Sequence, residues 1–564
     1  MRLEERLPSK TLLYVTWRGS AQRDPVRSLN PLLKLGTDPQ FLHFQKKTTE
    51  EVLRVVSPGA TQAAAWKEWM DKDTGDTVFA WLEGDEKAPK SQDADAAAAA
   101  AMSRMVFVYH NVSKIDFDAY WKDVEKLSGT EKTSVTPVEI GGRSAKKITI
   151  QKAVYYNLAA GDYILQAGSP EMLQELLARI EAKTPPADSI TQNAFWKASR
   201  SQVQPGASLE LFARFPDLGD VGSMLPPGAV PPGVDFTGIT KALHFDRFHG
   251  LVSTLHFEEG LTRVRSSLLG DAAAGSLFDL FAPGAASFRS AAAAPAAAQW
   301  YAAYRLDFAA LYMLIRSVVE AAAPGGQGPA TVELAEAGAM AQIGMSISDA
   351  LKLFTGEFGI YPVETGPEVT EAVFVAGIEN SEGVLKVLRL LLASTLTSED
   401  PQGTTTFLTF ATDYTDPKTQ AKRKRFQTIG VTPTAVILAP RKTMVREAIA
   451  RMAAASPSAS LAAQQNFVAS RGRLPQQLSG LAFFDLSKME WEKLTAQGAA
   501  ALQDVEKKAA EQQQKNPTGP KPPDFKVSEI FKGFPAALLK QYLHTAAGGL
   551  WKDARGVHYE SILD

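Results

Sequence analysis

The chain has 564 residues, with 60 lysines and arginines against 62 aspartates and glutamates, a formal net charge of −2 and no cysteine. This charge balance argues against a dedicated nucleic-acid binder, and the lack of cysteine excludes disulfides, thiolate metal sites, iron–sulfur clusters and cysteine nucleophiles. At 45% hydrophobic and 22% charged residues, the composition is that of a globular protein with ample apolar material for large cores.

The amino terminus lacks an apolar targeting segment, so no signal peptide is expected in this chain, and residues 12–15 are predicted to form the first strand. No run of 18 apolar residues occurs, so no membrane-spanning helix is expected. Location is left open: periplasmic or envelope-associated if a leader has been removed, otherwise cytoplasmic.

A recurring unit of apolar strand, short turn and amphipathic helix follows. Residues 105–109 and 163–165 are predicted strands, and an apolar stripe over 117–127 predicts a helix. Ser169-Pro170-Glu171 combines a cap, a first-turn proline and an early acid, which predicts a helix start. Two strand pairs with glycine-containing turns, 251–269 and 549–563, are predicted hairpins. Linkers or long loops are expected at 93–101, 226–233, 291–298, 323–331 and 512–523, although an alanine run could instead be helical.

The second part of the chain repeats features of the first. Residues 106–108 match 373–375, where a second helix with Val384, Leu385, Leu388 and Leu391 on its apolar side follows. Residues 163–180 match 435–452, and the same spacing then pairs Gln192, Phe195, Leu209 and Phe212 with Gln464, Phe467, Leu481 and Phe484. We therefore predict two related halves, 1–290 and 291–564. The expected fold class is α+β, each half having antiparallel strands and hairpins covered by amphipathic helices.

Three segments carry a family resemblance: Leu7-Pro8 with residues 12–15, residues 161–173, and 193–195 leading into 206–209. The chain resembles bacterial proteins that carry the domain of unknown function numbered 3352. The resemblance covers most of the chain loosely and implies no activity. Members typically begin with an export signal or membrane anchor, whereas no such segment is expected in this chain.

Histidine is densest around His244, Asp246, His249 and His256. Two imidazoles and a carboxylate suit a transition metal, but the spacing matches no known site, and ordinary polar residues entering a hairpin explain it better. We predict no metal site, no cofactor and no catalytic residue. The segment Gly141 to Lys147 lacks phosphate-loop spacing and is predicted to turn between strands.

Two further clusters suggest binding. Residues 422–425 form a compact basic run, which suits phosphate, anionic lipid or an acidic partner, or is simply a solvated loop. Trp66, Trp69 and Trp81, like Trp300 and Tyr301, either pack in a core or form an exposed aromatic patch.

Two hypotheses remain. The first is a non-enzymatic binding or scaffolding protein of the bacterial cell envelope, whose partner is an unknown protein or an apolar small molecule. An internal apolar cavity would indicate a lipid carrier, whereas a flat aromatic face would indicate a protein partner. The second is an unrecognised hydrolase with a site assembled from distant segments, because catalytic triads are set by geometry and not by chain order.

Overall fold

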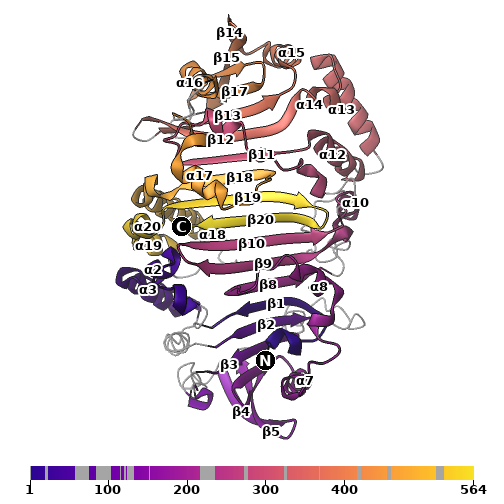
Figure 1. Ribbon diagram of the computed structural model, residues 1–564, viewed down its shortest axis with the longest axis vertical. Helices are drawn as coiled ribbons and strands as arrows, with labels where there is room; N and C mark the ends of the chain where they lie inside the picture. Colours follow the sequence, from indigo (N-terminus) through magenta and orange to yellow (C-terminus); the bar gives the residue numbers. More distant parts are fainter. Residues whose placement is uncertain are drawn as a thin grey trace.

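The protein is described by a computed structural model, which places residues 2–19, 23–56, 75–83, 103–112, 114, 116–119, 122, 133–150, 153–215, 235–271, 277–322, 327–366, 369–415, 421–453, 459–515 and 526–564. Helices and antiparallel strands mix along the chain, so the fold class is α+β as predicted. The elements build one long sheet flanked by helices (Figure 1).

The described strands are β1 (Thr11–Trp17), β2 (Thr77–Leu82), β3 (Met105–His110), β4 (Thr133–Ile140), β5 (Arg143–Ile150), β6 (Ala153–Ala160), β7 (Tyr163–Ala167), β8 (Leu209–Arg214), β9 (Phe248–Glu258), β10 (Leu261–Gly270), β11 (Trp300–Arg305), β12 (Phe354–Gly366), β13 (Val369–Ile378), β14 (Leu396–Gln402), β15 (Thr405–Thr415), β16 (Lys422–Val431), β17 (Ala435–Ala439), β18 (Gly480–Asp485), β19 (Thr545–Asp553) and β20 (Gly556–Leu563). Every pairing between them is antiparallel.

The order of the strands across the sheet has a two-fold character. From one edge it runs β4, β5, β6, β7, β3, β2, β1, β8, β9, β10, and from the other edge β14, β15, β16, β17, β13, β12, β11, β18, β19, β20. The second series repeats the first with ten added to each label. The two series meet where β10 pairs with β20, so a single sheet continues through both predicted halves.

The described helices are α2 (Pro31–Thr37), α3 (Pro39–Val56), α7 (Pro170–Glu181), α8 (Ala194–Arg200), α10 (Phe236–Ala242), α11 (Ser290–Ala293), α12 (Phe308–Ala322), α13 (Gly328–Ile343), α14 (Ile347–Leu351), α15 (Ser381–Leu392), α16 (Lys442–Ala453), α17 (Gln465–Gly472), α18 (Trp491–Lys515), α19 (Val527–Lys532) and α20 (Ala536–Tyr542). Within the residues placed by the structure, no helix combines the length and apolarity needed to cross a bilayer.

Local sequence explains several of these boundaries. Ser169 accepts a hydrogen bond from the Met172 amide and Pro170 is the first residue of α7, so the predicted helix start is confirmed. Gly141 and Gly142 join β4 to β5 with φ angles of 60° and 73°. A two-residue hairpin turn of this kind needs positive φ at both positions, which glycine adopts without strain, and the predicted turn is confirmed.

One face of the sheet, which we call the covered face, holds the two largest cores. In the first, α7 packs on β6 and β7, and Trp196 of α8 meets Tyr14 and Phe212 edge to face. In the second, α16 packs on β16 and β17, and Phe467 of α17 meets Tyr301 and Phe483 in the same way. In each core, therefore, one aromatic side chain of a short helix packs against aromatic residues of two adjacent strands.

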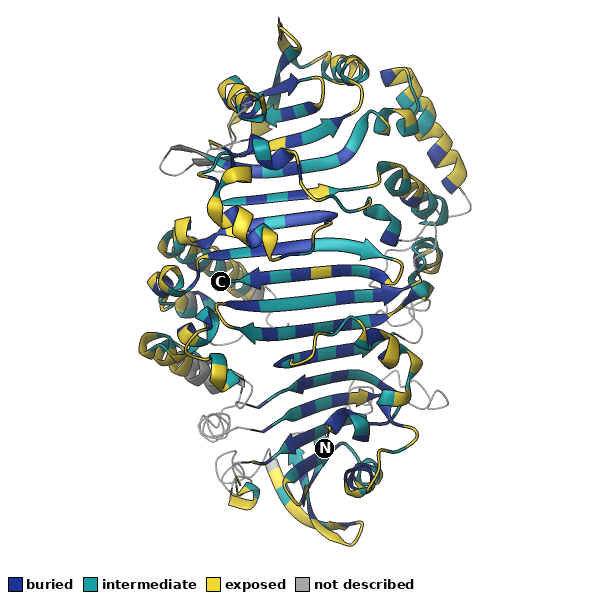
Figure 2. Ribbon diagram, viewed as in Figure 1, coloured by how far each residue is buried: buried dark blue, intermediate teal, exposed yellow. Residues whose placement is uncertain are grey.

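Helices also reach the opposite face, which we call the open face. At the β14 end, α15 packs there against Leu408, Ile429 and Leu438. At one side of the sheet, α2 and α20 form a smaller core whose neighbours include Ala546 and Leu563. Between these places, no described helix packs broadly on this side of the strands, whose residues are a mixture of buried and half-buried (Figure 2).

Some sequence expectations are wrong. Residues 291–298 were expected to form a linker, but Ala291, Ala293, Ala294 and Ala298 are buried in the second core. Gly359 lets α11 approach β12 closely, because a Cβ at this position would lie 2.5 Å from the Ser290 hydroxyl. Two other expected linkers are partly helical, since α13 begins at residue 328 and α18 continues to residue 515. Leu391, expected on the apolar side of its helix, is exposed.

The expected repeat also needs a shift of one residue after α7. Trp196, and not Phe195, occupies the place of Phe467 in the covered-face core. Phe212 is likewise matched in position by Phe483, whereas Phe484 lies on the open face. Side chains alternate between faces along a strand. Matching Phe212 with Phe484, as the sequence suggested, would therefore put every side chain of β8 on the opposite face from its counterpart in β18.

Candidate binding face

The open face carries a continuous uncharged row, mostly of apolar residues, across twelve strands, from β3 to β13. Directly paired residues of adjacent strands point to the same side, so the pairings define the row. It consists of Phe107, Phe79, Val15, Leu211, Ser253, Ser266, Tyr559, Leu550, Gly480, Tyr304, Phe358 and Ala376. No member of this row is charged.

A second row runs beside the first, two residues further along each strand. It consists of Trp17, Leu209, Leu255, Val264, Ser561, Gly548, Ala482, Ala302, Ile360 and Phe374. This row is also uncharged. With strands about 4.8 Å apart and rows about 7 Å apart, the two rows span roughly 50 Å by 14 Å, or about 700 Å².

Two tyrosines make the middle of this face shallow. A Cβ added to Gly548 would lie 2.5 Å from the Tyr559 hydroxyl, and one added to Gly480 would lie 2.9 Å from the Tyr304 ring. Each ring therefore lies over the glycine of a neighbouring strand, as aromatic rings do when they cover strand glycines. The rings remain 42% and 36% exposed, so their faces are available to a binding partner.

Three more large side chains on this face are exposed. Phe374 is 48% exposed and Phe484 37%, and both come from the second series of strands. Trp81, 38% exposed, lies on the same face in the first series, because it pairs with Leu13. Exposed aromatic residues thus occur from β2 to β13, and they form a patch larger than isolated surface residues would give.

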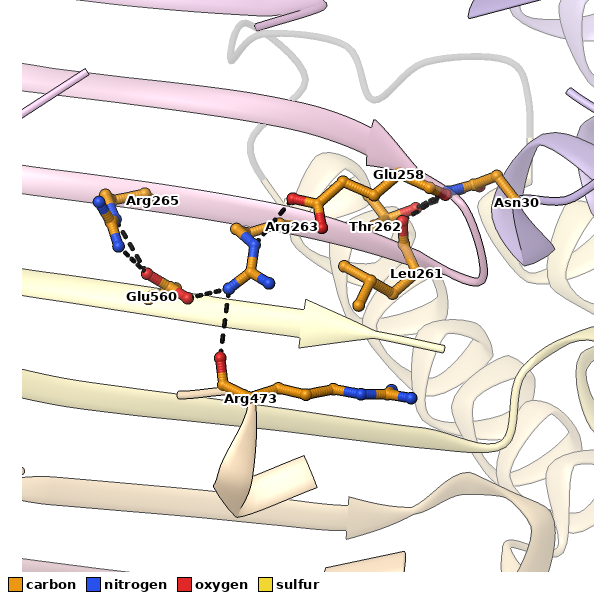
Figure 3. Close-up of polar contacts among 8 residues, drawn as sticks. All are labelled: Asn30, Glu258, Leu261, Thr262, Arg263, Arg265, Arg473 and Glu560. Atoms are coloured by element: carbon orange, nitrogen blue, oxygen red, sulfur yellow. Dashed lines mark hydrogen bonds and ion pairs between the residues drawn. The ribbon is translucent and has the colours of Figure 1, made fainter. Parts of the chain in front are cut away.

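On the covered face, the junction of the two strand series is ionic. The carboxylate of Glu560 on β20 accepts hydrogen bonds from Arg263 and from Arg265, the latter through Nε at 2.9 Å (Figure 3). Arg263 also donates to Glu258 at 2.8 Å, and the Arg265 guanidinium lies 5.9 Å from the Trp551 ring centroid. The Glu560 side chain is only 1% exposed, so these arginines neutralise a buried charge.

A buried asparagine fixes α2 to the same region. The Asn30 amide nitrogen donates to the carbonyl oxygens of Leu261 at 2.7 Å and Glu258 at 3.0 Å, at the turn between β9 and β10 (Figure 3). Its side-chain oxygen accepts from the Leu33 amide and caps α2. The Asn30 side chain therefore fixes the position of α2 relative to this turn.

Three polar groups beside this junction form a chain that resembles a catalytic triad in composition. His558 Nδ1 lies 2.9 Å from the Ser267 hydroxyl, and Nε2 lies 3.0 Å from Asp553. The usual arrangement is the reverse, with Nε2 towards serine and Nδ1 towards the carboxylate. Ser267 and His558 are each 1% exposed, and the Trp551 ring stacks on the imidazole at 5.3 Å. This geometry suits a structural hydrogen-bond chain.

Asp553 is held ionised by this chain. Burial pushes the pKa of Asp553 upward, but hydrogen bonds from His558 and from the backbone and side chain of Arg555 outweigh it. The pKa of Asp553 consequently falls to about 2.

A pocket of about 250 Å³ lies between α16 and the segment that precedes β11. Glu447 and Arg451 of α16 line it, together with Gln299, Pro362 and Val363 among others. Among the described residues, its lining contains one carboxylate and no histidine, and so no acid–base pair of the kind that a hydrolase would use.

The histidine-rich segment does not assemble a site. His244 precedes a short 3-10 helix, His249 is exposed and lies 3.2 Å from Asp271, and His256 is buried on the covered face. Among the residues placed by the structure, no three histidine, aspartate or glutamate side chains are grouped to hold a metal ion.

The structure also places the basic run and several of the aromatic residues that the sequence suggested for binding. The basic run 422–425 is the start of strand β16 and not a loop. Trp81 lies on the open face, whereas Tyr301 is fully buried and Trp300 is half-buried. Trp66 and Trp69 lie outside the described residues.

Sequence reasoning missed the open face itself. In β11 the residues Trp300-Tyr301-Ala302-Ala303-Tyr304 are apolar at both parities. Strands that are apolar on both sides are typical of sheets covered on both faces. Here that pattern is the signal of a face that remains half-exposed.

Comparisons with known proteins add little. No protein-family model matches the chain, and no curated protein matches it. Two crystal forms of TP0453 are similar in structure, at 12% and 11% identity, covering 48% of this chain and 81% and 80% of the other, with TM-scores of 0.24 and 0.23. At this TM-score the likeness carries no argument about function.

Proposed function

We propose that this chain is a non-enzymatic binding or scaffolding protein of the bacterial cell envelope, and that a protein partner binds its open face. One observation carries the proposal: two adjacent uncharged rows, with exposed aromatic rings at Tyr304, Tyr559 and Phe374, extend across the middle of the sheet. The envelope location rests on the family resemblance described above.

The shape of this face favours a protein over a small apolar molecule. Small-molecule sites are concave and enclose most of the ligand surface, but the rings of Tyr304 and Tyr559 lie over glycines and build no walls. The two rows cover about 700 Å², close to the ~800 Å² that each partner contributes to a standard protein interface. Aromatic side chains are also the residues that most often dominate binding energy at such interfaces.

We further propose that the two strand series derive from one duplicated unit. The repeated strand order supports this, as do the matching aromatic cores around Trp196 and Phe467. Duplication would also explain the length of the open face, because joining two sheets edge to edge doubles an apolar surface without creating a new fold.

The test is native mass spectrometry of the full chain, purified gently from its host, beside the variants Tyr559→Glu and Leu334→Glu. Leu334 is 75% exposed on α13 and serves as a matched control for adding a charge to an exposed apolar position. A complex of defined stoichiometry that Tyr559→Glu abolishes and Leu334→Glu preserves supports the proposal.

Two results would overturn it. A persistent small-molecule adduct released on denaturation would make the chain a carrier. A bare mass, or a complex equally sensitive to both substitutions, would remove the open face as the binding surface.

A hydrolase is the alternative, and the chain of Ser267, His558 and Asp553 is the observation that favours it. The burial of Ser267 and the reversed imidazole weigh against it. A panel of activated esters assayed with the native chain and Ser267→Ala decides the matter. Turnover that falls by more than about 100-fold in the variant would establish the alternative.

A further inference from the structure

The first four residues of β16 form an exposed cationic segment, which we call the basic strand end: Lys422, Arg423, Lys424 and Arg425. Phe426 follows immediately and is 54% exposed. Side chains alternate along the strand, so Phe426 shares one side with Lys424, and Arg425 points to the other side.

The basic strand end extends beyond the neighbouring strands of the sheet. It pairs with β15, where Lys424 lies opposite Asp413 and Arg423 opposite Tyr414. On its other edge, β17 begins to pair only at Thr428. The cations therefore lie on a two-stranded ribbon with both sides exposed, and the exposed Tyr414, opposite Arg423, lies on the other side from Phe426.

Two acidic residues on β14 are engaged by other cations. Glu399 on β14 pairs with Arg389 at 2.6 Å, and Asp400 pairs with Lys442. Within the residues the structure places, Lys424 and Arg425 have no carboxylate at ion-pair distance. The described part of the ribbon carries four cations and one carboxylate, that of Asp413 opposite Lys424, so its net charge is positive.

We propose that this ribbon docks on an anionic lipid surface. Clustered lysine and arginine are attracted to anionic headgroups, and exposed phenylalanine and tyrosine favour the boundary between headgroups and acyl chains. A nucleic acid is less well matched, because its phosphates need a basic surface of greater extent, and this chain carries a net charge of −2. This docking is independent of the partner proposed for the open face.

The experiment is co-sedimentation of the full chain with vesicles of phosphatidylglycerol and phosphatidylcholine, compared with pure phosphatidylcholine. Each basic residue near an anionic leaflet raises affinity by about fivefold, so Lys422→Gln with Lys424→Gln, on the same side of the strand as Phe426, is expected to weaken binding by roughly 25-fold. Phe426→Ser is expected to remove binding that persists at high salt, where charge attraction is screened. The control double variant is Lys507→Gln with Lys508→Gln, two exposed lysines on α18.

Three outcomes would overturn the inference. The first is equal binding to both vesicle types. The second is an equal loss in the control variant. The third is binding to duplex DNA but to neither vesicle, which would reassign the ribbon to nucleic acid. Anionic-vesicle binding that only the β16 variants weaken supports it.

Discussion

Removing the charge of Glu560 is expected to loosen the junction between β10 and β20. The substitution Glu560→Gln keeps the size of the side chain but leaves Arg265 without its carboxylate, while Arg263 retains Glu258. Removing one member of a buried ion pair typically costs 3–5 kcal/mol, since the other charge remains unpaired. The Arg265 side chain is 33% exposed, so water screens part of this cost, and we expect about 2–3 kcal/mol.

The assay is native-state hydrogen exchange, because a chain of 564 residues need not unfold in one step. Amides of β10 and β20 should exchange faster in Glu560→Gln, while those of β4 and β14, at the far edges, should not change. The control is Glu447→Gln, whose partner Arg451 lies 3.9 Å away and whose side chain is 64% exposed; it should cost less than about 0.5 kcal/mol.

The reasoning would be refuted if Glu560→Gln changed exchange at β10 and β20 no more than the control does. A second variant keeps the test informative if the first fails to fold. Replacing Glu560 and Arg265 together by methionine or leucine removes the charge that Glu560→Gln leaves unpaired, while Arg263 keeps Glu258, and it should recover most of the lost stability.

Two further predictions concern buried hydroxyls and acid stability. Tyr14→Phe should leave the free energy of unfolding within about 0.5 kcal/mol, because its buried hydroxyl has no hydrogen-bond partner among the residues that the structure describes. Tyr301→Phe loses a 2.7 Å bond to Ser290 and should cost roughly 1–2 kcal/mol; equal costs in urea denaturation would contradict this. Asp553 has a folded-state pKa of about 2, below its usual 3.8, so its contribution to stability is complete above about pH 4 and is lost as pH falls towards 2. The stability gap between the native chain and Asp553→Asn should therefore narrow over that range, and a constant gap would reject the assigned cause.

Local signals predicted individual elements well. The cap at Ser169 and the proline at position 170 predicted the first residue of α7 correctly, because both act within the first turn of the helix. The glycines between β9 and β10, and between β19 and β20, likewise predicted hairpins that the structure confirms.

Long-range features were harder to predict. The alanine-rich segment that includes Ala293 has no periodic apolar pattern, and only the close approach of β12 makes small side chains the right filling for the core. The basic run looked like a loop because its charges suit solvent, although β15 supplies a pairing partner that local sequence does not reveal. The open face depends on the order of twelve strands, which no single segment encodes.

The ionic junction also constrains what each half can do alone. Arg265 is the fifth residue of β10 and Glu560 the fifth residue of β20, and the two lie directly opposite each other. If two copies of the first half joined in the same register, arginine would face arginine; two copies of the second would oppose glutamate to glutamate. Separately expressed halves should therefore associate with each other and not with copies of themselves, because only the mixed pair places arginine opposite glutamate.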